Sequence, residues 1–194
     1  MSRRIPRGAQ GLVLPLSALA LLTGCGDDGM GAKPEPPSET PALWNPCDAL
    51  TTDFIEKELG ATTTKYAGKP AAPECRFAPA EDSGEPALTA NYQLFAGTLD
   101  EFFDQMGQTE DADVRKPEVP GADAARIVVA AEKDQLYVTG FVQNGPLFEV
   151  VNVVDPAPYD EARIVRGTVA TLAALSAHAD EKDAGTPASS GATD

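Results

Sequence analysis

The chain has 194 residues, a formal net charge of −15, and 42% hydrophobic against 23% charged residues. This apolar content is enough for one hydrophobic core and excludes a wholly disordered chain. A chain this acidic is repelled by the phosphates of nucleic acids, and we therefore expect no nucleic acid partner. A single histidine and three cysteines exclude a histidine-rich metal site and a four-thiolate zinc site.

Residues 1–24 have the pattern of a secretory signal peptide. A basic start precedes a short apolar run from Leu12 to Leu22, which is typical of an export signal. The run is shorter than the roughly 20 residues of a membrane-spanning helix, and Pro15 interrupts it. General secretion is favoured, although Ser2-Arg3-Arg4 faintly resembles a twin-arginine signal and leaves the export route open.

The end of this segment, Leu22-Thr23-Gly24-Cys25, resembles the bacterial lipobox. The resemblance implies transfer of a diacylglyceryl group to the Cys25 thiol and cleavage between Gly24 and Cys25. The two acyl chains of this group, palmitate being one expected chain, would give a stable anchor, because a single chain gives only marginal membrane binding. We therefore expect a lipoprotein on the extracytoplasmic face of the cell membrane. The alternative is that Cys25 is only a small hydrophobe at the edge of an apolar segment.

Residues 25–44 are predicted to be the lipidated cysteine and a disordered linker. Glycine is frequent at the start, and Pro34-Glu35-Pro36-Pro37 favours an extended middle. Residues 45–179 are predicted to form one domain, and residues 180–194, which are small and polar, a disordered tail.

Cys47 and Cys75 are expected to form a disulfide. Export would place them in an oxidising compartment, where paired cysteines are usually bonded. Such a bridge would join the N-terminal helix of the domain to a nearby strand. The alternative, a metal-binding or redox-active thiol pair, has no Cys-x-x-Cys spacing and no nearby histidine to support it.

The first half of the domain predicts two helices and three strands. After a turn at Asn45-Pro46-Cys47-Asp48, Thr51 or Thr52 caps a helix that ends at Leu59 and is stopped by Gly60. Strands are expected over 62–66, 74–78 and 87–95, a second helix over 98–107, and a polar loop with at most a short strand over 108–123.

The second half predicts a meander and a long helix. Apolar strands are expected over 125–131, 135–142 and 147–154, joined by short turns. Residues 159–179 form an amphipathic pattern with Val165, Val169, Leu172 and Leu175 on one side. The order of elements predicts an α+β fold: one antiparallel sheet covered by helices.

Tyr137 and Phe141 fall on one face of their expected strand, and Val138 and Val142 on the other. If helices cover only one face of the sheet, the other face is a candidate docking surface. The reading that we favour has the final helix on one side and a loop on the other.

Five features recur together in this chain: the lipobox, the linker, the opening Asn45-Pro46-Cys47-Asp48-Ala49-Leu50-Thr51, the helix end Leu59-Gly60 and the later Cys75-Arg76-Phe77. In these features the chain resembles a family of actinobacterial lipoproteins of unknown function. Pro120-Gly121-Ala122-Asp123-Ala124-Ala125 loosely fits a turn common in the same family. The order of elements is also similar to the PsbP-like fold of some mycobacterial envelope lipoproteins. Both resemblances imply an exported, anchored module and bring no catalytic residue.

Motifs of catalysis are weak. His178 is expected at the surface near a helix end, where a cation is mildly favourable and a general base is not indicated. Asp100, Glu101 and Asp104 favour the start of a helix. The acidic segment Glu110-Asp111-Ala112-Asp113 lacks the glycine and the closing glutamate of a calcium loop.

The reading that we prefer is a non-catalytic binding or accessory module of the cell envelope, monomeric and without a cofactor or metal. Its partner is expected to be an envelope protein, an apolar ligand or a surface polymer. The alternative is an envelope hydrolase with a carboxylate-based site, since the spacing of such a pair is set in three dimensions. A purely structural lipoprotein is the third reading.

Overall fold

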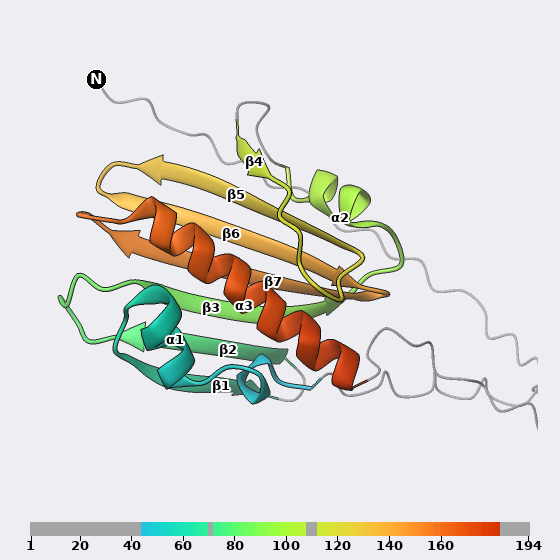
Figure 1. The fold of residues 1–194 in the computed structure, drawn as a ribbon, viewed down its shortest axis with the longest axis horizontal. Coiled ribbons are helices and arrows are strands. Elements are labelled where there is room, and N and C mark those ends of the chain that lie inside the picture. Colours follow the sequence, from blue (N-terminus) through green and yellow to red (C-terminus); the bar gives the residue numbers. More distant parts are fainter. Residues whose placement is uncertain (1–43, 70–71, 108–111, 183–194) are drawn as a thin grey trace, which may run out of the picture. The chain divides into compact units, whose positions relative to one another are not determined.

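The computed structural model describes residues 44–69, 72–107 and 112–182. Their strands form one seven-stranded antiparallel sheet in the order β1-β2-β3-β7-β6-β5-β4 (Figure 1). The elements are η1 (Pro46–Asp48), α1 (Thr52–Leu59), β1 (Thr63–Lys69), β2 (Ala72–Pro79), β3 (Ala87–Leu94), α2 (Leu99–Gln105), β4 (Asp113–Arg115), β5 (Ala124–Glu132), β6 (Gln135–Asn144), β7 (Leu147–Pro156) and α3 (Glu161–Glu181). The predicted signal peptide, Gly24, Cys25 and the linker up to residue 43 lie outside the described residues.

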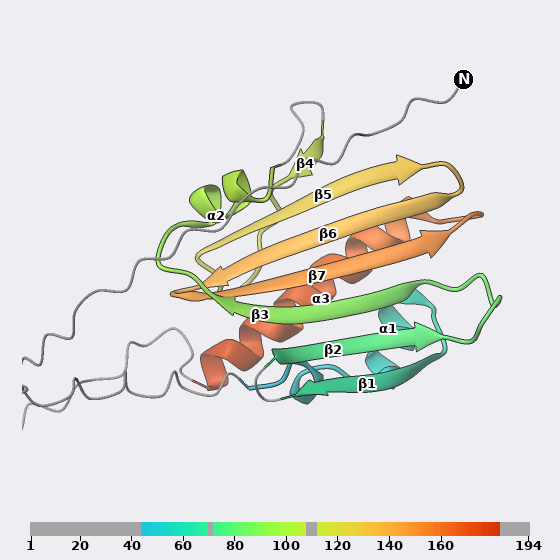
Figure 2. The same cartoon turned by 180° about the vertical axis from the view of Figure 1, so that it is seen from behind.

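The expected α+β fold, with one antiparallel sheet and a long C-terminal helix, is confirmed. Helices α1 and α3 lie against one face of the sheet, in front of it in Figure 1 and behind it in Figure 2. Helix α2 packs on the opposite face through Leu99 and Phe102. No helix within the described ranges is long and apolar enough to cross a membrane.

Local signals explain where the first helix begins and ends. Thr51 is the N-cap of α1, and its hydroxyl accepts a hydrogen bond from the backbone N–H of Phe54 at 3.1 Å. Gly60 ends the helix with φ at +73°, in the left-handed region that glycine enters without strain. Gly60 was predicted for its role, and Thr51 was one of the two residues predicted as the cap.

The meander pairs as the sequence predicts, with each strand two residues longer than expected. Residues of β5, β6 and β7 alternate between the two faces, so that Ile127, Val138 and Val151 face α3 while Val128, Phe141 and Val150 face α2. The meander therefore contributes apolar side chains to both faces of the sheet, under α3 and under α2. The pairing of β3 with β7 then joins the meander to β1 and β2.

The buried side of α3 differs from the prediction. Leu172 and Leu175 are buried as expected, but Val165 and Val169 are only partly buried. The buried stripe is completed by Ile164, Gly167, Thr168, Thr171, Ser176 and Ala179. Threonine is tolerated there because each hydroxyl donates to the carbonyl four residues earlier, at 2.8 Å in both cases.

Glycine at position 167 sets how closely α3 approaches α1. A Cβ at that position would lie 2.5 Å from Leu59 Cδ2 and 2.7 Å from the carbonyl oxygen of Glu58. The helix also runs on through Asp180 and Glu181, which the sequence had assigned to the tail. Its last turn is tied to the sheet, because Asn144 Nδ2 donates to Asp180 Oδ1 at 3.3 Å. The rest of the predicted tail, residues 183–194, is not described.

Candidate functional site

The predicted disulfide joins Cys47 and Cys75, with 4.9 Å between their Cα atoms. It connects β2 to the short helix η1 rather than to α1, which corrects the expected partner. Lys65 on β1 also holds this segment, since its Nζ donates to the carbonyl oxygens of Cys47 and Leu50 at 3.2 Å each. The start of the domain is therefore pinned to the edge of the sheet.

Trp44, which the sequence placed at the end of the linker, belongs to the domain. Its ring packs against Tyr92 and His178, with centroid distances of 4.0 and 4.3 Å. The position of His178 corrects the expectation of a surface residue, because its side chain is only 13% exposed. Its Nδ1 lies 3.7 Å from a carboxylate oxygen of Glu181. His178 thus lies in the last turn of α3, as expected, and contacts a carboxylate of the same turn.

A polar row crosses the face of the sheet opposite α3. Five residues stand side by side on neighbouring strands, and we call them the open face: Tyr66, Arg76, Thr89, Asn152 and Thr139. The Arg76 guanidinium lies 4.7 Å from the centre of the Tyr66 ring. Thr139 Oγ1 donates to Asn152 Oδ1 at 3.1 Å. Three of the five, Tyr66, Arg76 and Asn152, are exposed.

Helix α2, and not a loop, covers the other end of this face. Phe102 packs against Phe141 and Phe148, at centroid distances of 6.2 and 4.8 Å. Arg126 on β5 forms an ion pair with Asp100 at the start of α2. The sequence placed Tyr137 and Phe141 on one face correctly, but α2 buries Phe141 and leaves Tyr137 37% exposed. The open face is therefore the part that α2 does not reach.

Several of the acidic residues singled out in the sequence have structural partners, whereas Asp104 falls in the last turn of α2 and not near its start. Glu101 closes a capping box with Thr98; the backbone N–H of Thr98, and then its hydroxyl, donate to the carboxylate and lower its pKa. Asp113 bonds to Arg115, which lowers the pKa of Asp113 and also reaches Glu161 at the start of α3. Glu110 and Asp111 lie outside the described residues.

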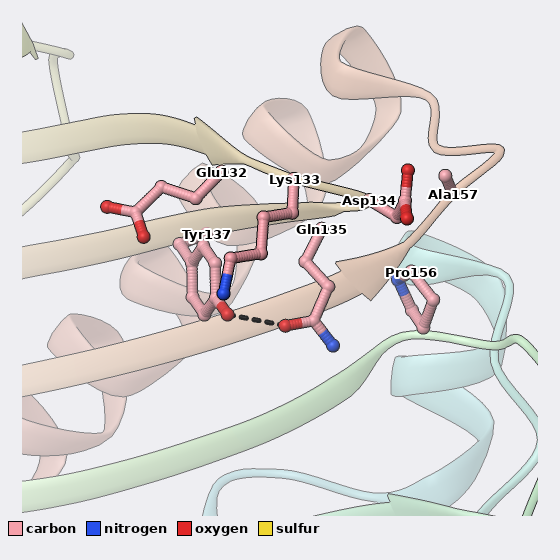
Figure 3. Close-up of a pocket in the computed structure, with 7 residues that line it drawn as sticks. All are labelled: Glu132, Lys133, Asp134, Gln135, Tyr137, Pro156 and Ala157. Carbon is pink, nitrogen blue, oxygen red and sulfur yellow. Dashed lines mark hydrogen bonds between the residues drawn. The ribbon is translucent and has the colours of Figure 1, made fainter.

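A shallow cavity of about 430 Å³ lies where β5 turns into β6. Figure 3 shows its seven lining residues: Glu132, Lys133, Asp134, Gln135, Tyr137, Pro156 and Ala157. The Tyr137 hydroxyl donates to Gln135 Oε1. The carboxylates of Glu132 and Asp134 point away from each other in this view. This cavity therefore holds no converging carboxylate pair of the kind that a glycosidase needs.

Neither metal-binding residues nor known relatives point to a function for this chain. Across the described parts of the chain, no three His, Cys, Asp or Glu residues are grouped so as to hold a metal ion. No protein-family model and no curated protein matches the chain.

The sequence reasoning missed the polar residues buried inside the sheet. Glu149 and Asp155 on β7 are 0% and 2% exposed, and Asn144 on β6 is 4% exposed. Burial raises the pKa of both carboxyls. The sequence did carry one signal, the ionisable Glu149 inside the apolar run Leu147-Phe148-Glu149-Val150-Val151. Burying an ionisable side chain costs free energy, so its presence in a buried strand points to a partner or a site.

Proposed function

We propose that this protein is a membrane-anchored extracytoplasmic lipoprotein that acts as a non-catalytic binding or accessory module of the cell envelope. Lipidation at Cys25, after cleavage from Gly24, would hold it at the outer face of the membrane. The observation that carries the proposal is the use of the three cysteines. Cys47 and Cys75 are bonded to each other, which suits an oxidising compartment, and Cys25 alone stands in the lipobox-like sequence.

The open face supports the binding part of the proposal. It is broad and rich in hydroxyl, amide and guanidinium groups, so its chemistry suits a hydrophilic partner such as an envelope protein or a surface polymer better than an apolar ligand. Arg76 and Asn152, which lie on either side of Thr89 in the row, are exposed. The hydrolase reading has less support, since Glu101 serves a helix cap and Asp100 and Asp113 form ion pairs.

Photo-crosslinking in the producing cell tests this use of the open face. A crosslinking amino acid at position 152 is expected to yield discrete adducts, because Asn152 is exposed and lies between Thr89 and Thr139 in the polar row. The matched control is position 166, since Arg166 is also exposed but lies on α3, which packs on the opposite face of the sheet. Adducts of equal yield from both positions, or none from position 152, would contradict the proposed surface.

A further inference from the structure

The C-terminal end of α3 covers a layer of polar side chains on the inner face of the sheet. Glu149 lies in this layer with no exposed surface. Its direct cross-strand neighbour on β3 is Tyr92, which is 5% exposed. Asn144 on β6 reaches up to Asp180 of α3. In Figures 1 and 2 this end of α3 lies beside the segment that begins at Trp44.

Several polar atoms of this layer have no partner. Within the described residues, ten buried side-chain atoms lack a hydrogen bond, and six of them lie here: both carboxyl oxygens of Glu149, the Tyr92 hydroxyl, Asn144 Oδ1, Trp44 Nε1 and His178 Nε2. Native proteins rarely leave buried polar groups unpaired, and where several occur together, water or a ligand commonly completes them. The layer is therefore incomplete on its own.

The charges around Glu149 favour a cation as the missing group. Burial, and then the nearby Asp180 carboxylate, raise the pKa of Glu149 to about 9. Burial, then Glu149, then Asp48 of η1 raise the pKa of Tyr92 as well. In the described chain, no lysine or arginine forms a salt bridge with Glu149 or Asp180. His178 on α3 faces Trp44 and pairs weakly with Glu181.

The acceptors suit an ammonium group better than a metal ion. A metal ion needs several ligands in a defined geometry, and the described residues provide no such group. A primary ammonium group has three N–H donors, and Glu149, Asn144 and Tyr92 each offer an unpaired oxygen.

We propose that this layer is a buried binding site for the primary ammonium group of a small amine. Glu149 is its counter-ion, and Tyr92 and Asn144 accept the remaining N–H groups. Trp44 covers the site, since it packs over Tyr92 and His178 just before the disulfide-pinned segment. The site lies across the sheet from the open face and does not depend on a lipid anchor.

Binding is expected to release one proton, from the carboxyl group of Glu149 to the buffer. The ammonium ion enters with its charge, the O–H bond of the Glu149 carboxyl breaks, and its proton passes to the buffer. The carboxylate that remains accepts an N–H of the ligand. Affinity is therefore expected to rise with pH until Glu149 is ionised in the free protein.

Calorimetric titration of the full chain with methylammonium chloride tests the site. We expect binding with release of about one proton, seen by comparing buffers of different ionisation heat, and an affinity that rises roughly 100-fold between about pH 6.5 and about pH 8.5. Glu149→Gln is expected to abolish binding, and Tyr92→Phe to weaken it roughly tenfold or more through loss of a hydrogen bond to a charged group.

Asp155→Asn is the matched control, because Asp155 is a buried carboxyl on the same strand and outside the layer. It is expected to bind methylammonium as the natural chain does. No binding by the natural chain, or equal binding by Glu149→Gln, would overturn the proposal. An equal response to potassium chloride would overturn the assignment of an N–H donor and leave only a general cation effect.

Discussion

Replacing Glu149 with glutamine is expected to stabilise the protein at neutral pH. The pKa of this buried carboxyl is raised from 4.5 to about 9, so between these values the unfolded state has lost a proton that the folded state keeps. Stability then falls as pH rises, by about 1.4 kcal/mol per pH unit. At pH 7 the accumulated loss is on the order of 3 kcal/mol, which the glutamine variant does not suffer.

Urea unfolding at about pH 4, 7 and 9 measures this effect. The two proteins are expected to have similar free energies of unfolding at the lowest pH, where the carboxyl is protonated in both states, and to diverge as pH rises. A smaller decline remains in the variant, because burial also raises the pKa of Asp155. Parallel pH profiles for the two proteins would contradict the buried, protonated state of Glu149.

The Cys47–Cys75 bridge closes a loop between cysteines that are 28 positions apart in sequence. Its removal is expected to destabilise the domain by about 3–4 kcal/mol, because the unfolded chain then gains the conformational freedom of a loop of this length. The double variant Cys47→Ala/Cys75→Ala should show this loss in urea, and a reducing agent should produce it in the natural chain.

Cys25→Ala is the control for the bridge, since Cys25 lies before the described domain and its loss is expected to leave the unfolding midpoint unchanged. Equal midpoints for the oxidised and reduced natural protein would show that the bridge contributes nothing. The pinning of η1 to β2 would then have to come from Lys65 and its two carbonyl partners.

The elements with strong local signals could be predicted from the sequence. Thr51 and Gly60 mark the ends of α1 because capping depends on a few neighbouring residues. The three strands of the meander follow from apolar runs separated by short turns. The disulfide followed from cysteine count and the inference of export.

Long-range arrangements could not be predicted in the same way. The pairing of β3 with β7 joins segments that are far apart in the chain, and no local pattern specifies it. The place of α2 on the second face depends on that sheet, as does the ion pair of Asp100 with Arg126. The sequence therefore predicted a helix at residues 98–107 but not what it covers.

The buried polar layer was missed for a related reason. Residues 147–151 of strand β7 are buried on both faces, so this part of the sequence has little alternation from which to decide where Glu149 points. Its neighbours Tyr92 and Val142 follow only from the register of three strands. The contact of Trp44 with His178 likewise joins the two ends of the domain.

Intact mass spectrometry of the chain extracted from cell membranes tests the proposed lipoprotein most directly. The predicted result is a mature chain that begins at Cys25 and carries a diacylglyceryl group and a further acyl group, with Cys47 and Cys75 oxidised. Cys25→Ala should remove the lipid mass and release the protein from the membrane fraction. A chain that begins at Met1, bears no lipid and resides in the cytosol with free thiols would contradict both the anchor and the compartment.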